Sequence, residues 1–154
     1  MKQKIIMLDI DGVLNPSCSM ADRRFTRQIC DDGCVERLKR IVEATDAKIV
    51  LTSTWRFGAL MPECPSLVAE FDRLRAEMKL YGLKIFSVTK KLGRRDDEIM
   101  NWLEHHPNVE SWVAIDDDSF DMTSVIEAGR FVHTNTLIGL QDEHIKLAIN
   151  ILNK

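Results

Sequence analysis

Two acidic segments of the sequence come directly after apolar runs that are typical of buried strands. Asp9 and Asp11 follow the run at residues 4–8, and three consecutive aspartates at residues 116–118 follow the run at residues 112–115. Because side chains alternate along a strand, Asp9 and Asp11 can share one face where the strand ends. If the two segments end neighbouring strands, several carboxylates converge in one small volume.

Converging carboxylates repel one another unless a cation binds between them or some of them take up protons. Ligands that are all oxygen favour a hard cation, Mg²⁺ above all, which commonly binds one or two carboxylates together with a substrate phosphate. A metal ion beside a carboxylate would bring a phosphate dianion close to a nucleophile that otherwise repels it. The acidic segments therefore predict a Mg²⁺-dependent phosphoryl-transfer site.

Hydroxyl and basic side chains that suit the same reaction lie between the two acidic segments. Thr52 follows an apolar run at residues 47–51 and could hydrogen-bond the transferring phosphoryl oxygens, with Ser53 as the nearest substitute. A cation from the segment that follows could neutralise charge on the same group, and the candidates are Lys90, Lys91, Arg94 and Arg95. Asp11, if protonated at the start, could donate to the leaving oxygen and later deprotonate the attacking water.

Short apolar runs alternate with segments of helical periodicity along the chain. Strands are expected at residues 4–8, 47–51, 84–88, 112–115 and 131–132, and helices around residues 35–42, 67–78, 99–103, 125–126 and 145–152. Unbroken apolar strands separated by helices predict a mainly parallel sheet covered on both faces, which is a doubly wound α/β fold. Such sheets bind ligands outside the carboxyl ends of their strands, where the acidic and hydroxyl segments would meet.

Length and composition are those of one ordinary globular domain. The chain has 154 residues and no Gly/Ser/Pro-rich linker, so we expect a single domain at residues 1–154. Hydrophobic residues at 45% and charged residues at 29% argue against a disordered or membrane chain. The first apolar run is too short for a signal peptide or membrane span, which makes a cytoplasmic location the default expectation. The net charge of -3 gives no global attraction for nucleic acid, although local basic clusters could still bind phosphates.

The cysteines and histidines do not indicate a second metal site. Cys18, Cys30, Cys34 and Cys64 lack the paired spacing of a zinc site, and we expect reduced thiols. The four histidines are expected to be structural or solvated, because the sequence shows no convergent partners for metal ligation.

The ordered motifs also resemble a known family. The chain resembles phosphatases of the haloacid dehalogenase (HAD) superfamily, and most closely the short HAD domain of "Swiss Army knife" RNA-repair proteins. The likeness extends over nearly the whole chain. It rests on LDIDGVLN at residues 8–15, VLTSTWR at residues 50–56, Arg95 ahead of Glu98-Ile99 and Trp102-Leu103, IDD at residues 115–117 and Gly139-Leu140.

The resemblance implies a Rossmann-like core and a role for each motif. It makes Asp9 the nucleophile and a metal ligand, and Asp11 the general acid/base whose backbone carbonyl also binds the metal. Thr52 becomes the phosphate-binding hydroxyl. Asp117 becomes a further metal ligand, and Asp121 fits the downstream acid of the family.

Two positions depart from the simplest match to the family. Asp116 stands where many relatives carry glycine, so whether it binds the metal or supports a neighbouring ligand stays open. The family usually needs one basic residue, and the spacing to Glu98-Ile99 favours Arg95, with Lys91 and Arg94 in reserve. Arg56 is a further candidate for substrate contact.

Larger members of the family insert cap domains over the site, but this chain has little room for one. Residues 15–48 are expected to hold a loop and one helix, and residues 56–84 about one long helix. The site should therefore have a minimal cap or none. An open site suits the end of a polymer and also admits small nucleotides.

The expected activity is that of a Mg²⁺-dependent phosphomonoesterase with an aspartyl-phosphate intermediate, acting on a phosphorylated substrate such as a nucleotide or nucleic-acid end. A non-enzymatic switch like a response-regulator receiver would use similar residues. Its acceptor aspartate would follow a middle strand, whereas here the second strand is followed by Thr52. A phosphotransferase or a phosphatase of small metabolites would also fit the acidic, hydroxyl and basic segments. No membrane association is expected, and the sequence indicates no protein partner.

Overall fold

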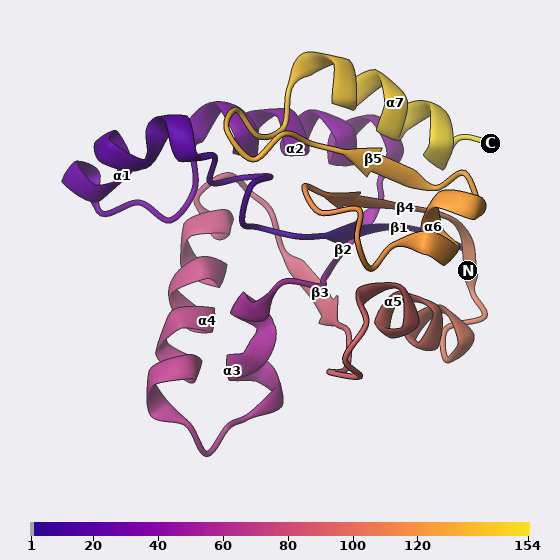
Figure 1. The fold of residues 1–154 in the computed structure, drawn as a ribbon, viewed down its shortest axis with the longest axis horizontal. Helices are drawn as coiled ribbons and strands as arrows, with labels where there is room; N and C mark the ends of the chain where they lie inside the picture. The colour runs from indigo at the N-terminus through magenta and orange to yellow at the C-terminus, as the bar shows by residue number, and fades with distance from the viewer. Residues whose placement is uncertain (1) are drawn as a thin grey trace.

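The computed structural model describes residues 2–154, and at its centre lies a sheet of five parallel strands (Figure 1). The strands are β1 (Gln3–Leu8), β2 (Lys48–Leu51), β3 (Ile85–Val88), β4 (Val109–Asp116) and β5 (Phe131–His133). They lie side by side in the order β3-β2-β1-β4-β5. The doubly wound α/β fold predicted from the sequence is confirmed.

Seven α-helices and two 3₁₀ turns connect the strands within residues 2–154. They are η1 (Ser17–Ser19), α1 (Met20–Thr26), α2 (Asp32–Thr45), η2 (Thr54–Arg56), α3 (Phe57–Leu60), α4 (Pro65–Lys79), α5 (Arg95–Glu104), α6 (Thr123–Glu127) and α7 (Asp142–Leu152). In the part of the chain that the structure describes, no helix is both long enough and apolar enough to cross a membrane.

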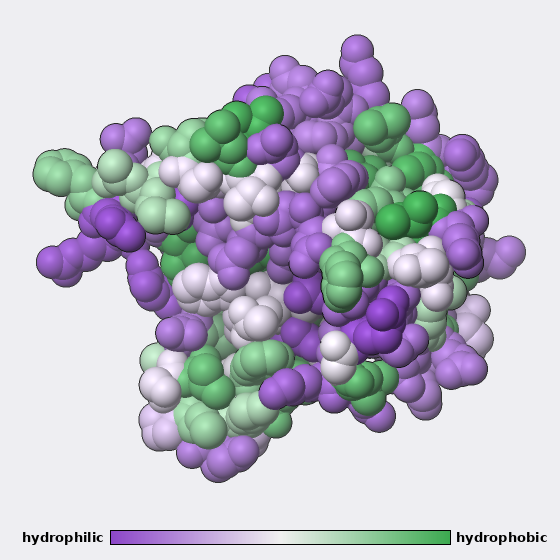
Figure 2. Space-filling view, viewed as in Figure 1, coloured by the Kyte–Doolittle hydropathy of each residue, from purple (hydrophilic) through white to green (hydrophobic). Residues whose placement is uncertain are grey.

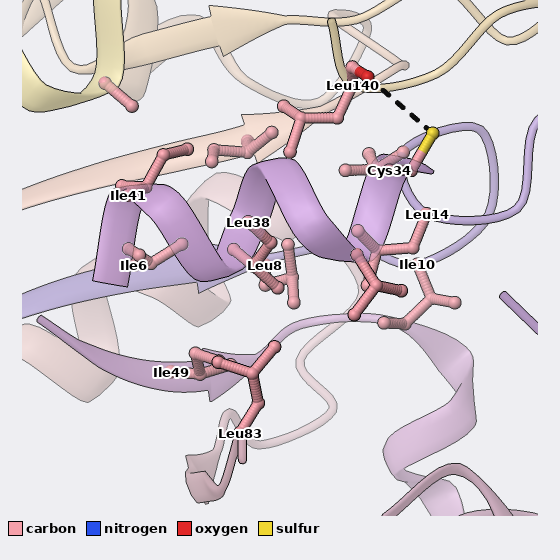
Figure 3. Close-up of a cluster of buried hydrophobic side chains, with 14 of the residues drawn as sticks. Ile6, Leu8, Ile10, Leu14, Cys34, Leu38, Ile41, Ile49, Leu83 and Leu140 are labelled. Atoms are coloured by element: carbon pink, nitrogen blue, oxygen red, sulfur yellow. Dashed lines mark hydrogen bonds between the residues drawn. The ribbon is translucent and has the colours of Figure 1, made fainter. Parts of the chain in front are cut away.

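One face of the sheet packs against α2 and α7. Ile6 and Leu8 of β1 are fully buried in a cluster with Leu38 and Ile41 of α2 and Ala148 of α7. Figure 3 shows the side chains of Leu38 and Leu8 meeting between α2 and the sheet. Each buried side chain of this size stabilises the fold by about 1.5–3 kcal/mol, so this face contributes a large part of the stability.

The opposite face packs against α5 and α6. Ile5 and Met7 alternate along β1 with Ile6 and Leu8 and so point to this second face. They are buried against Ile99 and Trp102 of α5 and Val125 of α6. Burial of both faces explains why β1 has an unbroken apolar sequence. β1 is therefore a rigid central element from which the acidic residues beyond it are presented.

The connections hold more helix than the sequence indicated. Residues 15–48 contain η1 and α1 as well as α2, so the expectation of a single helix there was wrong. Residues 56–84 likewise contain the short α3 ahead of α4. Hydrophobic periodicity gave no signal for α1 because none of its residues is buried. Neither addition has the size of a cap domain.

The strand register brings the site together at one edge of the sheet. Leu8 is paired with Leu51 of β2 and with Ile115 of β4. Asp9, Thr52 and Asp116 follow these three residues directly, so they lie side by side at the carboxyl edge of the sheet. The backbone N–H of Asp9 donates to the carbonyl of Ile115, and that of Thr52 donates to the carbonyl of Leu8.

Candidate active site at the carboxyl edge of the sheet

Three aspartates from two neighbouring strands meet at this edge. One carboxylate oxygen from each of Asp9, Asp116 and Asp117 lies within 4.8 Å of the other two. Asp9 and Asp116 are buried, with 7% and 3% of their surface exposed. The oxygen ligands of one octahedral Mg²⁺ are up to about 4.2 Å apart, so a small closure would let the three share an ion. The predicted convergence of the two acidic segments is confirmed.

Burial makes this cluster unfavourable without a cation. Burial raises the pKa of Asp9 to about 8, and the nearby carboxylate of Asp116 adds to this rise, while Arg95 lowers it only in part. Burial also raises the pKa of Asp116, against the opposing effect of Arg95. The fold therefore favours a proton or a metal ion between the carboxylates. Because every donor is a carboxylate oxygen, the site fits Mg²⁺.

The cleft that contains these aspartates has a volume of about 370 Å³. Its lining consists of Asp9, Asp11, Thr54, Arg56, Phe57, Lys91, Gly93, Arg95, Glu98, Asp116, Asp117, Asp118 and Asp121. Of the predicted metal ligands, Asp11 and Asp121 line the cleft but lie outside the cluster of three carboxylates. A volume of this size is within the range of small-ligand sites.

Arg95, the first residue of α5, reaches the carboxylates. Its Nη1 lies 2.8 Å from Oδ2 of Asp116 and 3.3 Å from Oδ1 of Asp9. Burial disfavours its charge, but Asp9 and Asp116 together raise the pKa of Arg95 above its ordinary value. A fixed cation beside Asp9 is the kind of group that could neutralise charge on a bound phosphate.

The other basic candidates lie further from the carboxylate cluster. Arg94 pairs with Asp96, at 3.1 Å between Nε and Oδ1, and with Asp121, at 3.4 Å between Nη1 and Oδ1. Nζ of Lys91 lies 5.0 Å from the ring centre of Phe57 at the wall of the cleft. Lys90 is exposed. Among the four, Arg95 is the residue that contacts Asp9 and Asp116 within residues 2–154.

Three hydroxyl residues follow β2, of which Thr52 and Ser53 are buried and Thr54 is exposed to the cleft. Thr52 and Ser53 are both buried, with 1% and 0% of their surface exposed. Oγ of Ser53 accepts a hydrogen bond from the backbone N–H of Trp55, at 3.2 Å, and so caps η2. Thr54 is exposed and lines the cleft, a residue that the sequence analysis missed because it lies in the turn rather than at the strand end.

Asp11 is exposed, and two side chains fix its orientation. Its Oδ1 accepts hydrogen bonds from Nδ2 of Asn15, at 2.7 Å, and from the indole Nε1 of Trp55, at 3.1 Å. Asn15 is held in turn because its Oδ1 accepts from the backbone N–H of Gly12. Trp55 was interpreted from the sequence only as part of a motif. Its contact with Asp11 could not be inferred, because 44 residues separate the two.

Gly12 allows Asp117 to approach the loop after β1. Its φ of +77° is in the left-handed region, and a Cβ at this position would lie 1.9 Å from Oδ2 of Asp117. The same Oδ2 accepts a hydrogen bond from Oγ1 of Thr136, at 2.8 Å, and Oγ1 of Thr134 donates to the carbonyl of Gly12. Thr134 and Thr136 therefore orient the site, and no motif in the sequence indicated them.

Arg56 forms part of the cleft floor, but its N–H groups already have partners inside the protein. Nε donates to the carbonyl of Thr89, and Nη1 donates to the carbonyls of Thr52 and Ser53. Nη2 donates to the carbonyl of Lys90 and lies 3.1 Å from Oε1 of Glu98. These contacts use all five donors of a guanidinium and tie the ends of β2 and β3 to α5.

The comparisons with known proteins agree with this geometry. The family described as the HAD domain in Swiss Army Knife RNA repair proteins matches residues 5–145. The chain belongs to this family. Separate searches of curated proteins and of solved structures found no match. The resemblance inferred from the ordered motifs is confirmed, and membership suggests the hydrolase chemistry of HAD domains, which generally use Mg²⁺.

The HAD domain should gain more stability from Mg²⁺ at higher pH. The pKa of Asp9 lies above that of the unfolded chain, so the native state binds more protons between about pH 4 and 8, and stability without metal falls as the pH rises. Mg²⁺ would replace the proton. Thermal unfolding in chelator and in Mg²⁺ should therefore show a larger rise in Tm at about pH 8 than at about pH 6. In Asp9→Asn this difference between the two pH values should shrink; an equal Mg²⁺ effect at both in the wild type would contradict the assignment.

Replacing Arg56 by alanine should be strongly destabilising. The change leaves the buried Glu98 carboxylate without its partner and several carbonyls without donors, which should cost about 3–5 kcal/mol of unfolding free energy. Urea denaturation measures this cost. The matched control is Arg75→Ala, because Arg75 forms an exposed pair with Asp72 and its loss should cost less than about 1 kcal/mol. Similar losses for both variants would disprove the bridging role.

Proposed function

We propose that this HAD domain is a Mg²⁺-dependent phosphomonoesterase that forms an aspartyl-phosphate on Asp9. The observation that carries the proposal is the position of the Asp9 carboxylate, which lies beside Asp116, Asp117 and the guanidinium of Arg95 in an open cleft. A nucleophile, metal-binding oxygens and a fixed cation are the components that phosphoryl transfer requires.

The metal would be held by Asp9, Asp117 and the backbone carbonyl of Asp11. Mg²⁺ bound there would reduce the repulsion between the phosphate dianion and the Asp9 carboxylate and so favour attack on phosphorus. Asp116 is better suited to hold Arg95, because its Oδ2 accepts from Arg95 and its Oδ1 accepts from the backbone N–H of Asp118.

The reaction would proceed in two displacements at phosphorus, with Asp9 as the nucleophile of the first and the leaving group of the second. A carboxylate oxygen of Asp9 forms a bond to phosphorus as the bond to the leaving oxygen breaks, and Asp11 donates a proton to that oxygen. Water then attacks phosphorus as Asp11 takes its proton, the bond between phosphorus and the Asp9 oxygen breaks, and inorganic phosphate leaves while the Asp9 carboxylate is restored. Trp55 and Asn15 keep Asp11 oriented, and Arg95 would stabilise charge on the transferring group. Thr52, the expected phosphate-binding hydroxyl, is 1% exposed and does not line the cleft.

The end phosphate of a nucleic acid is the substrate class that we favour. The cleft is open, and the family to which the chain belongs is named for RNA repair. The strand order supports an enzyme over a receiver-like switch, since flavodoxin-like receivers have the order 2-1-3-4-5 and this sheet has the order 3-2-1-4-5.

Asp9→Asn should abolish Mg²⁺-dependent release of p-nitrophenol from p-nitrophenyl phosphate. Loss of the nucleophile should lower kcat by at least about a thousandfold. The control Asp97→Asn makes the same change at an exposed residue of α5 and should leave kcat unchanged. Mass spectrometry of a trapped adduct should locate the phosphoryl group on Asp9. Retained turnover by Asp9→Asn, or an adduct on another aspartate, would refute the mechanism.

A panel of phosphorylated substrates should identify the natural class. We expect a higher kcat/KM for oligonucleotides that carry a 5′- or 3′-phosphate than for mononucleotides or sugar phosphates, because the open cleft leaves room for the rest of a polymer. Phosphate release can be measured for each substrate at equal concentration. A strong preference for mononucleotides or sugars would instead identify a phosphatase of small metabolites.

A further inference from the structure

α1 is a helix that the hydrophobic core does not require. None of its seven residues is buried, and the side chain of Phe25 is 91% exposed. Figure 1 shows α1 projecting from the same end of the molecule at which β1 ends, and Figure 2 shows hydrophilic and apolar side chains projecting together from this end. The ring of Phe25 is therefore free to contact a ligand.

Four arginines surround a hollow between α1 and α4. Its volume is about 470 Å³, and it is lined by Met20, Arg23, Arg24, Arg27, Gln28 and Arg73. Within residues 2–154, none of these arginines forms an ion pair. In a chain with a net charge of -3, this hollow is lined by four arginines and no acid, and acidic residues line an adjoining hollow that shares Arg23 and Gln28 with it.

Backbone carbonyls hold two of the four arginines, Arg23 and Arg73, whereas the exposed Arg24 and Arg27 have no such side-chain contact within residues 2–154. Arg23 donates from Nη1 to the carbonyl of Ile29, at 2.9 Å, and from Nη2 to the carbonyl of Pro16, at 2.7 Å. Nη2 of Arg73 donates to the carbonyl of Arg27, at 2.5 Å, which fastens the end of α1 to α4. Carbonyls satisfy the N–H groups without cancelling the charge. The hollow is therefore a cationic surface, anchored by Arg23 and Arg73 and with Arg24 and Arg27 exposed, that is suited to phosphate oxygens.

This surface is structurally connected to the candidate active site. The backbone N–H groups of Ser17 and Cys18, just before α1, donate to the carbonyls of Thr136 and Leu137. Thr136 also donates from Oγ1 to Asp117 in the carboxylate cluster. The base of α1 and the carboxylate cluster are therefore fixed by the same loop.

We propose that Arg24, Arg27 and Arg73 bind the phosphodiester backbone of a single-stranded nucleic acid, and that Phe25 stacks on one of its bases. Guanidinium groups bind phosphates through paired hydrogen bonds, and exposed aromatic side chains stack on bases that are free of a duplex. Placing the phosphorylated end of that strand in the cleft rests on the proposed function, whereas binding of the strand itself does not.

The test is binding of a fluorescent oligonucleotide of about 12 nucleotides without end phosphates, measured by anisotropy at several salt concentrations. The variant Arg24→Gln/Arg27→Gln/Arg73→Gln should raise Kd by at least about tenfold and should reduce the slope of log K against log[salt] by about 2. Single-stranded RNA and single-stranded DNA are measured in parallel, because both carry the phosphodiester backbone and the comparison shows which of them binds more tightly.

Two further variants separate binding from a loss of structure. Arg24→Gln/Arg27→Gln keeps the Arg73 side chain that fastens α1 to α4 and should still weaken binding, and Phe25→Ala should raise Kd by about tenfold through lost stacking. The matched control Lys39→Gln/Arg40→Gln/Lys146→Gln removes the same charge from α2 and α7 and should bind like the wild type. All variants should hydrolyse p-nitrophenyl phosphate at the wild-type rate.

The outcomes distinguish this proposal from the proposed function. Unchanged oligonucleotide binding by the arginine variant, or equal weakening by the control variant, would overturn the binding surface even if Asp9→Asn proves inactive. Wild-type protein that sediments with anionic phospholipid vesicles but does not bind the oligonucleotide would overturn it too and show a membrane contact instead. An active Asp9→Asn variant would refute the mechanism and leave the binding result standing.

Discussion

The repulsion among the carboxylates of Asp9, Asp116 and Asp117 is the constraint on which the site depends. The parallel register of β1 and β4 forces these groups together, and burial prevents water from relieving the repulsion. Arg95 offsets part of it, and a divalent cation can offset the remainder. The same arrangement that is costly for folding brings the proposed nucleophile Asp9, a second carboxylate that could hold a metal and the positive charge of Arg95 to one point.

The surrounding structure keeps this costly arrangement in place. Arg56 and Glu98 link the ends of β2 and β3 to α5, and α5 begins with Arg95. Next to the loop after β1, Gly12 has no side chain and so leaves room for the carboxylate of Asp117. A hydrogen bond from Oγ1 of Thr136 then holds that carboxylate. These supporting groups are held by contacts inside the protein, whereas Asp11 and Thr54 are exposed at the cleft and can meet a substrate.

The fold and the main residues of the site were predictable because both depend on local patterns. Apolar runs in the sequence predicted the positions of all five strands. The aspartates directly after β1 and at the end of β4 could then be expected to meet at the carboxyl edge of the sheet. The contact of Trp55 with Asp11 was not predictable, because it depends on how η2 turns after β2. Arg56 was interpreted as a substrate contact from its place in a motif, but the structure surrounds its guanidinium with carbonyls and Glu98. Long-range contacts of this kind leave no periodic signal.

The central position of β1 has a consequence for how the chain acquires activity. β1 pairs with β2 on one side and on the other with β4, which comes far later in the chain. Pairing between strands so distant in sequence raises the contact order. It also means that Asp9, the proposed nucleophile, is synthesised well before Asp116 and Asp117. A nascent chain that ends before β4 would carry Asp9 without Asp116 or Asp117. The carboxylate cluster can therefore form only after β4 has been synthesised and has paired with β1.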